Sequence, residues 1–161
     1  MILHITQPEA EDYLKLTEIC QAANRNWGYP DYLIDLWQDK LTITPRYIRS
    51  HYMLKAENQI GEILGFGAIK KEFASNIFDL MHLWMLPGHK YQYIGQMLLS
   101  NLEQQAQHRD IIKTVVDPNL SDFFKKSGYQ KVGEVKSQPD GRKMPLFKKV
   151  VERVKIVEPL P

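Results

Sequence analysis

Hydrophobic residues recur along this chain with two spacings, and each spacing predicts a different kind of element. In residues 9–24 and again in residues 94–107 the apolar side chains are three or four positions apart, which is typical of one face of an amphipathic helix. Residues 77–86 and residues 111–116 are instead short apolar runs bounded by polar segments. Such runs predict strands that are buried inside a sheet.

Local signals add shorter elements between these segments. Thr44-Pro45 has the form of a helix N-cap followed by proline at the first helical position, and Gly128 suits the C′ position of a short helix. The predicted strands are residues 2–6, 51–56, 60–73, 77–86, 111–116, 129–136 and 144–151, and the predicted helices are residues 9–24, 31–38, 45–50, 94–107 and 120–127.

This order of elements predicts an α+β fold, with a mixed and mostly antiparallel sheet of six to seven strands flanked by four to five helices. The helix at residues 94–107 connects the two most apolar strands, so we expect those strands to be parallel neighbours. Gly65 and Gly67 interrupt the strand at residues 60–73 and predict either a bulge or close packing there.

Composition narrows the class of protein. A chain of 161 residues with 43% hydrophobic and 25% charged residues suits one globular domain, which we expect over residues 1–150 with a tail at residues 151–161. The net charge of +2 is too small to favour a nucleic acid partner. Cys20 is the single cysteine, no leader opens the chain, and no apolar run approaches the roughly 20 residues that span a bilayer. We therefore expect a cytoplasmic protein without membrane association.

Residues 83–99 carry the most informative pattern in the chain. They read as the end of an apolar strand, a short polar loop that contains Pro87 and Gly88, and the start of an amphipathic helix. The first N–H groups of a helix have no partner within the helix, and they lie at the positive end of its dipole. This arrangement predicts a site for an anionic group at the start of the helix.

Four segments of the chain resemble, in order and spacing, one subgroup of the GNAT acetyltransferase superfamily, and together they cover about residues 1–150. They are Trp27-Gly28-Tyr29-Pro30, Leu80-Met81-His82-Leu83-Trp84 with Pro87 and Gly95, Asp117-Pro118-Asn119 with Phe123-Phe124 and Ser127-Gly128-Tyr129, and Val132-Gly133-Glu134 with Gly141-Arg142-Lys143-Met144-Pro145. The resemblance implies that an amine attacks the thioester of acetyl-CoA directly. It also implies a V-shaped opening between the strands that end at Leu86 and Val116.

The resemblance further implies where acetyl-CoA, the expected acyl donor, would bind; no metal is expected. The backbone of Leu83, Trp84 and Met85 would pair with the pantetheine arm and supply the donors for the oxyanion. Asn119 would contact the same arm, and Phe124 would lie near the thioester. The residues expected at the pyrophosphate are Lys90, Tyr91, Gln92, Tyr93, Ile94, Gly95 and Gln96, where Tyr91 and Tyr93 stand at positions often occupied by glycine.

Asp79 and His82 are the candidates for a general base that deprotonates the amine. They are three residues apart, so a regular strand would point them to opposite faces, and only a bulge would bring both toward the opening. His82 is equally well interpreted as a hydrogen-bonded structural histidine. The resembling family usually donates a proton to the leaving thiolate from a tyrosine at the position of Phe124, which has no hydroxyl.

Trp27, Tyr29 and Arg142 are the candidate contacts of the acceptor, which we expect to be a small primary amine. Aromatic faces can hold its cationic form, and the guanidinium could bind an acidic part of the same molecule. A homodimer is one option for the assembly. Because Met81 and Phe124 replace polar residues of the resembling family, a non-catalytic CoA-binding or partner-binding module on the same scaffold is the alternative function.

Overall fold

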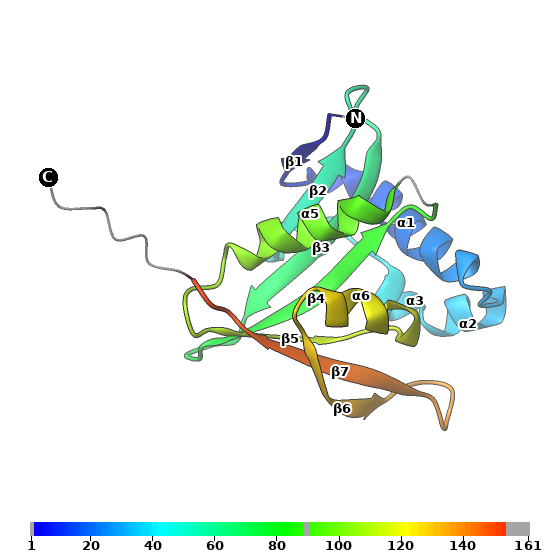
Figure 1. The fold of residues 1–161 in the computed structure, drawn as a ribbon. Helices are drawn as coiled ribbons and strands as arrows, with labels where there is room; N and C mark the ends of the chain where they lie inside the picture. The colour runs from blue at the N-terminus through cyan, green and yellow to red at the C-terminus, as the bar shows by residue number, and fades with distance from the viewer. Residues whose placement is uncertain (1, 89–90, 154–161) are drawn as a thin grey trace, which may run out of the picture.

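A mixed sheet forms the centre of the molecule in the computed structural model, which describes residues 2–88 and 91–153 (Figure 1). Within these residues the sheet has seven strands in the order β1-β2-β3-β4-β5-β7-β6. The strands are β1 (His4–Thr6), β2 (Tyr52–Glu57), β3 (Ile63–Lys71), β4 (Ile77–Met85), β5 (Ile111–Val115), β6 (Gln130–Lys136) and β7 (Lys143–Val150). All neighbouring strands are antiparallel except β4 and β5, which are parallel as predicted.

Helices cover both faces of this sheet. They are α1 (Tyr13–Asn26), α2 (Asp31–Leu36), α3 (Gln38–Leu41), α4 (Pro45–Ser50), α5 (Gln92–Glu103) and α6 (Ser121–Lys126), with short 3₁₀ turns at Ala10–Asp12 and Pro118–Leu120. Figure 1 shows α5 crossing one face while α1 and α2 lie on the other. Each face buries its own apolar cluster, one centred on α5 and one on α1, so the predicted α+β class is confirmed.

Most differences from the predicted elements lie at their ends. The segment predicted as one helix at residues 31–38 forms α2 and α3, which meet at Trp37. Helix α5 begins two residues before the predicted start and ends at Glu103, four residues before the predicted end. The cap prediction at Thr44 is confirmed, because its hydroxyl accepts a hydrogen bond from the backbone N–H of Tyr47 at 3.1 Å. Gly128 has a φ of +90°, which suits its predicted position after α6.

Gly65 lies on the β3 face that meets α5, and it marks close packing. A Cβ atom at Gly65 would come within 2.8 Å of the carbonyl oxygen of Trp84 and 3.1 Å of the Ile94 side chain. The predicted bulge in β3 is present as well, because Ala56 pairs with Gly65 while Glu57 pairs with Ile63, which leaves Leu64 as an extra residue. A second bulge lies in β4, where Ala68 pairs with His82 and Ile69 pairs with Leu80, which leaves Met81 as an extra residue.

Candidate active site

Strands β4 and β5 separate after only three paired positions. The parallel ladder joins Ile77, Phe78 and Asp79 to residues 111–113, and no later pair continues it among the described residues. At the point of separation the hydroxyl of Thr114 donates a hydrogen bond to the backbone oxygen of Leu80 at 3.0 Å. The strands therefore form the V-shaped opening that the resemblance implies.

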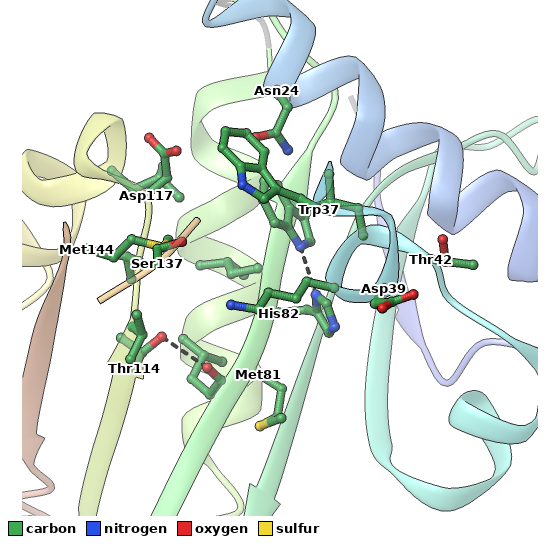
Figure 2. A pocket seen from close by; sticks show the side chains of 18 of the residues that line it. Asn24, Trp37, Asp39, Thr42, Met81, His82, Thr114, Asp117, Ser137 and Met144 are labelled. Atoms are coloured by element: carbon green, nitrogen blue, oxygen red, sulfur yellow. Dashed lines mark hydrogen bonds between the residues drawn. The ribbon is translucent and has the colours of Figure 1, made fainter. Parts of the chain in front are cut away.

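A cavity of about 440 Å³, which we call the central cavity, occupies this opening. Residues 80–84 of β4 line one wall, and residues 114–117 of β5 and the following turn line the other. Figure 2 shows Trp37 and Asn24 at one end, Asp117, Ser137 and Met144 on one side, and Asp39 and Thr42 on the opposite side. Its volume is in the range of small-molecule sites.

A second hollow of about 630 Å³, the loop groove, runs from the end of β4 to the start of α5. Pro87 and Gly88 line it together with Gln92 and Gln96 of α5 and Lys126 of α6. The groove and the central cavity share Leu83, Trp84 and Leu120, so the two hollows meet beside the unpaired edge of β4.

The backbone of β4 presents donors to this meeting point. The N–H of Leu86 donates to the oxygen of Leu64 in β3 at 2.9 Å. Because N–H directions alternate along a strand, the N–H groups of Leu83 and Met85 point away from β3 and toward the opening, whereas that of Trp84 points toward β3. Of the three residues predicted here, two thus present donors to the opening.

The imidazole of His82 lies in the central cavity wall and accepts a hydrogen bond at Nδ1 from the indole N–H of Trp84, 2.9 Å away (Figure 2). Burial, and to a smaller extent the nearby His51, lowers the pKa of His82 to about 4. The ring is therefore neutral at physiological pH.

Asp79 lies on the same face of β4 as His82, because the bulge at Met81 shifts the alternation by one residue. The regular-strand expectation of opposite faces is thus wrong for this strand. The Asp79 carboxylate lies 3.5 Å from the ammonium of Lys113, which also pairs with Glu72. Burial raises the pKa of Asp79, and Lys113 opposes this shift. Asp79 does not line either hollow.

Asp117 is a hydrogen-bonding centre in the wall of the central cavity, and it was not among the predicted site residues. One carboxylate oxygen accepts from the hydroxyl of Tyr29 at 2.9 Å and from the guanidinium of Arg142 at 3.1 Å. The other accepts from the backbone N–H and the side-chain amide of Asn119 at 2.8 and 2.7 Å. The structure thus brings three predicted site residues to one carboxylate. The Asp-Pro-Asn sequence directly after a buried strand is the feature of the sequence that could have indicated a site role for Asp117.

Aromatic rings surround this centre. The guanidinium of Arg142 lies 4.2 Å from the ring centre of Trp37 and 5.6 Å from that of Tyr29. The rings of Trp27 and Trp84 are 6.1 Å apart, and both line the loop groove. Of the predicted acceptor contacts, Arg142 lines the central cavity and Trp27 lines the loop groove, whereas Tyr29 lines neither hollow; the predicted pantetheine contact Asn119 also lines neither.

The start of α5 holds the residues predicted at the pyrophosphate. Gln92 and Gln96 line the loop groove, while Ile94 and Gly95 are buried beneath it. Tyr91 and Tyr93 are not part of the groove lining, and Lys90 lies outside the described residues. A Cβ atom on Gly95 would lie 2.2 Å from the methyl carbon of Met85 and 3.2 Å from the Phe123 ring, so Gly95 permits close packing of α5 on β4 and α6.

Lys126 in the last turn of α6 is a groove residue that the sequence prediction missed. The signal in the sequence was the segment Phe-Phe-Lys-Lys, in which Lys126 follows Phe123 by three positions, or about one helical turn. Phe123 lines the same groove. Phe124 points the other way, toward the central cavity, and is 1% exposed between the rings of Phe123, Tyr129 and Phe147.

Comparison with known proteins agrees with this geometry. The model of the acetyltransferase (GNAT) family matches residues 13–129, and the chain therefore belongs to the GNAT acetyltransferase family. No curated protein matches the chain in sequence. The described residues include no helix long and apolar enough to cross a membrane and no group of three or more side chains that could hold a metal ion.

Solved structures share the fold. PaiA N-acetyltransferase from Thermoplasma acidophilum, in complex with coenzyme A, is 20% identical with a TM-score of 0.72, over 94% of this chain and all of its own. A GCN5-related N-acetyltransferase from Rhodopseudomonas palustris is 20% identical with a TM-score of 0.68, over 93% of this chain and 95% of its own. The apo form of YjaB from Escherichia coli is 19% identical with a TM-score of 0.62, over 92% of this chain and 96% of its own.

Proposed function

We propose that this acetyltransferase transfers the acetyl group of acetyl-CoA to the primary amine of a small molecule. The observation that carries the proposal is the junction of the two hollows at Leu83, Trp84 and Leu120. Acetyl-CoA would lie in the loop groove with its thioester at this junction. The acceptor would approach from the central cavity.

The lining of the loop groove suits a nucleotide-tailed thioester. The positive end of the α5 dipole and the ammonium of Lys126 both favour phosphate oxygens, and Gln92 and Gln96 provide neutral donors. Met85, Leu86 and Phe123 give the groove an apolar wall for the pantetheine arm. Lys90, which the sequence places at the loop, remains a predicted phosphate contact.

Attack of the neutral amine on the thioester carbon moves the carbonyl electron pair onto oxygen. The N–H groups of Leu83 and Met85 face this position, and loss of one such donor typically costs about 3–4 kcal/mol of transition-state stabilisation. Collapse of the intermediate then breaks the C–S bond and releases the CoA thiolate.

The surplus proton on the amide nitrogen would pass to the thiolate through water, because Phe124 has no hydroxyl to supply one. A thiol with a pKa of about 8.5 leaves without full protonation. The missing acid is expected to reduce the rate by about 10²-fold or more relative to an enzyme that has one.

The acceptor cavity combines an apolar wall with one fixed cation. Arg142 is held by Asp117 and lies over the ring of Trp37, so its remaining N–H groups are preorganised for an acidic or carbonyl group of the acceptor. Trp27 lines the loop groove and Tyr29 donates a hydrogen bond to Asp117, and both remain predicted contacts of the amine.

The test combines binding and turnover. Acetyl-CoA at about 100 times its dissociation constant should stabilise the fold by about 2.7 kcal/mol, measured as a shift in thermal unfolding. A thiol-reactive dye should then report CoA release with at least one member of a panel of small primary amines. Stabilisation without any thiol release would instead support the non-catalytic CoA-binding module, and the absence of both would contradict the proposal.

A further inference from the structure

The hydrogen bond between Trp84 and His82 fixes the position of the imidazole proton. An indole N–H can only donate, so Nδ1 of His82, which lies 2.9 Å from it, must be the unprotonated nitrogen. The neutral ring then carries its single proton on Nε2. The lone pair on Nδ1 is already engaged, which leaves neither nitrogen able to accept a proton from an ammonium group.

The surroundings keep the ring in this neutral form. The ring centres of Tyr47 and Phe66 lie 5.5 and 6.0 Å from that of His82. His51, the residue after α4, further disfavours a positive charge on the His82 ring. Among the described residues no carboxylate bonds to His82 to stabilise an imidazolium. The charged side chains that line the cavity are those of Asp39, Lys40, Asp117 and Arg142, and the last two form an ion pair with each other.

The Nε2 side of the ring is the side available to a ligand. No described residue bonds to Nε2, and the atom is not among the fully buried polar atoms that lack a partner. Because His82 lines the central cavity, its N–H offers one neutral donor to whatever occupies that space.

We propose that His82 donates a hydrogen bond from Nε2 to an oxygen atom of the acceptor, and that Trp84 is a positioning residue that holds the imidazole in this tautomer. The acceptor is therefore a primary amine that also carries a carbonyl, carboxylate or hydroxyl group. Water, and not His82, takes the proton from its ammonium form. The assignment of the ligand rests on the proposed acetyl transfer, whereas the tautomer does not.

Nitrogen NMR of the whole protein labelled at histidine tests the tautomer. At neutral pH the His82 signals should show a protonated Nε2 and an unprotonated Nδ1. Trp84→Phe keeps an aromatic ring but removes the donor, so it should give a mixture of tautomers and a higher pKa for His82. His108, whose Nδ1 instead accepts from the backbone N–H of Arg153, serves as the unchanged reference. A protonated Nδ1 or a charged ring in the wild type would overturn the inference.

Kinetics test the donor role. His82→Gln retains a side-chain N–H and should keep kcat/KM within about threefold, whereas His82→Leu should raise the acceptor KM up to about tenfold without changing the KM for acetyl-CoA. An acceptor lacking the oxygen should lose this difference. A loss of 10² or more in kcat for both variants would identify His82 as the base and refute the proposal. If no amine is acetylated, the proposed function fails, and the NMR result still decides the tautomer.

Discussion

Replacing Asp117 with asparagine should destabilise the fold substantially. The Asp117 side chain is 4% exposed and that of Arg142 is 17% exposed, so the substitution leaves a mostly buried guanidinium without its counterion. Asparagine would also weaken the hydrogen bond from Tyr29. Removing one partner of a buried ion pair typically costs 3–5 kcal/mol. The Ser137 hydroxyl, 3.1 Å from the guanidinium, still accepts from it, so we expect the lower end, about 3 kcal/mol.

Chemical denaturation followed by tryptophan fluorescence measures this loss. Asp39→Asn is the matched control, because Asp39 is an exposed carboxylate in the lining of the same cavity, and it should change the unfolding free energy by less than about 0.5 kcal/mol. The double variant Asp117→Asn with Arg142→Gln should be less destabilised than the sum of the two single variants, by about 2 kcal/mol. A loss below about 1 kcal/mol for Asp117→Asn, or strict additivity in the double variant, would refute the reasoning.

Three further predictions concern the two hollows. Phe124→Tyr places a hydroxyl at the central cavity and should raise kcat for acetyl transfer by about 10- to 100-fold, since it restores a proton donor for the thiolate; steady-state thiol release measures it. Gly95→Ala forces Met85 and Phe123 apart and should weaken acetyl-CoA binding about tenfold or more in calorimetry, at a stability cost of about 1–3 kcal/mol. The pKa of His82 in the fold, about 4, lies below its unfolded value near 6.5, so the unfolded state binds the extra proton between these pH values. Wild-type stability should therefore fall by up to about 3 kcal/mol from pH 6.5 to pH 4, and His82→Gln should lack that component in denaturation at each pH.

Matched variants separate these effects from general damage. Phe123→Tyr adds the same hydroxyl beside the loop groove, and an equal rise in its kcat would argue against Phe124 as the acid position. Gly133→Ala, where a Cβ meets nothing within 4 Å, should leave acetyl-CoA binding unchanged, and unaltered affinity in Gly95→Ala would contradict the packing argument. An identical pH profile of stability in wild type and His82→Gln would mean that the imidazole is not buried as the structure has it.

The sequence predicts the elements well wherever one face of the element is apolar. Helix α5 has apolar residues at helical spacing, and strands β4 and β5 are short apolar runs, so both patterns can be read without tertiary information. The resemblance to the GNAT family adds the opening between β4 and β5. The family model and the solved structures agree with that fold.

The details of the site depend on long-range contacts that the sequence does not reveal. Asp117 binds Tyr29, 88 positions away, and Arg142, 25 positions away. The bulge at Met81 arises from the pairing of β4 with β3, and it reverses the expected relation of Asp79 and His82. The pairing of Asp79 with Lys113 likewise follows from the register of two strands, which no local pattern specifies.

A crystal structure of the protein with bound coenzyme A tests the central claim most directly. We expect the diphosphate at the start of α5 beside Gln92 and Lys126, and the sulfur atom between the separated ends of β4 and β5, within reach of the N–H groups of Leu83 and Met85. Coenzyme A bound at any other surface, or the two strands closed against each other with the ligand excluded, would contradict the account.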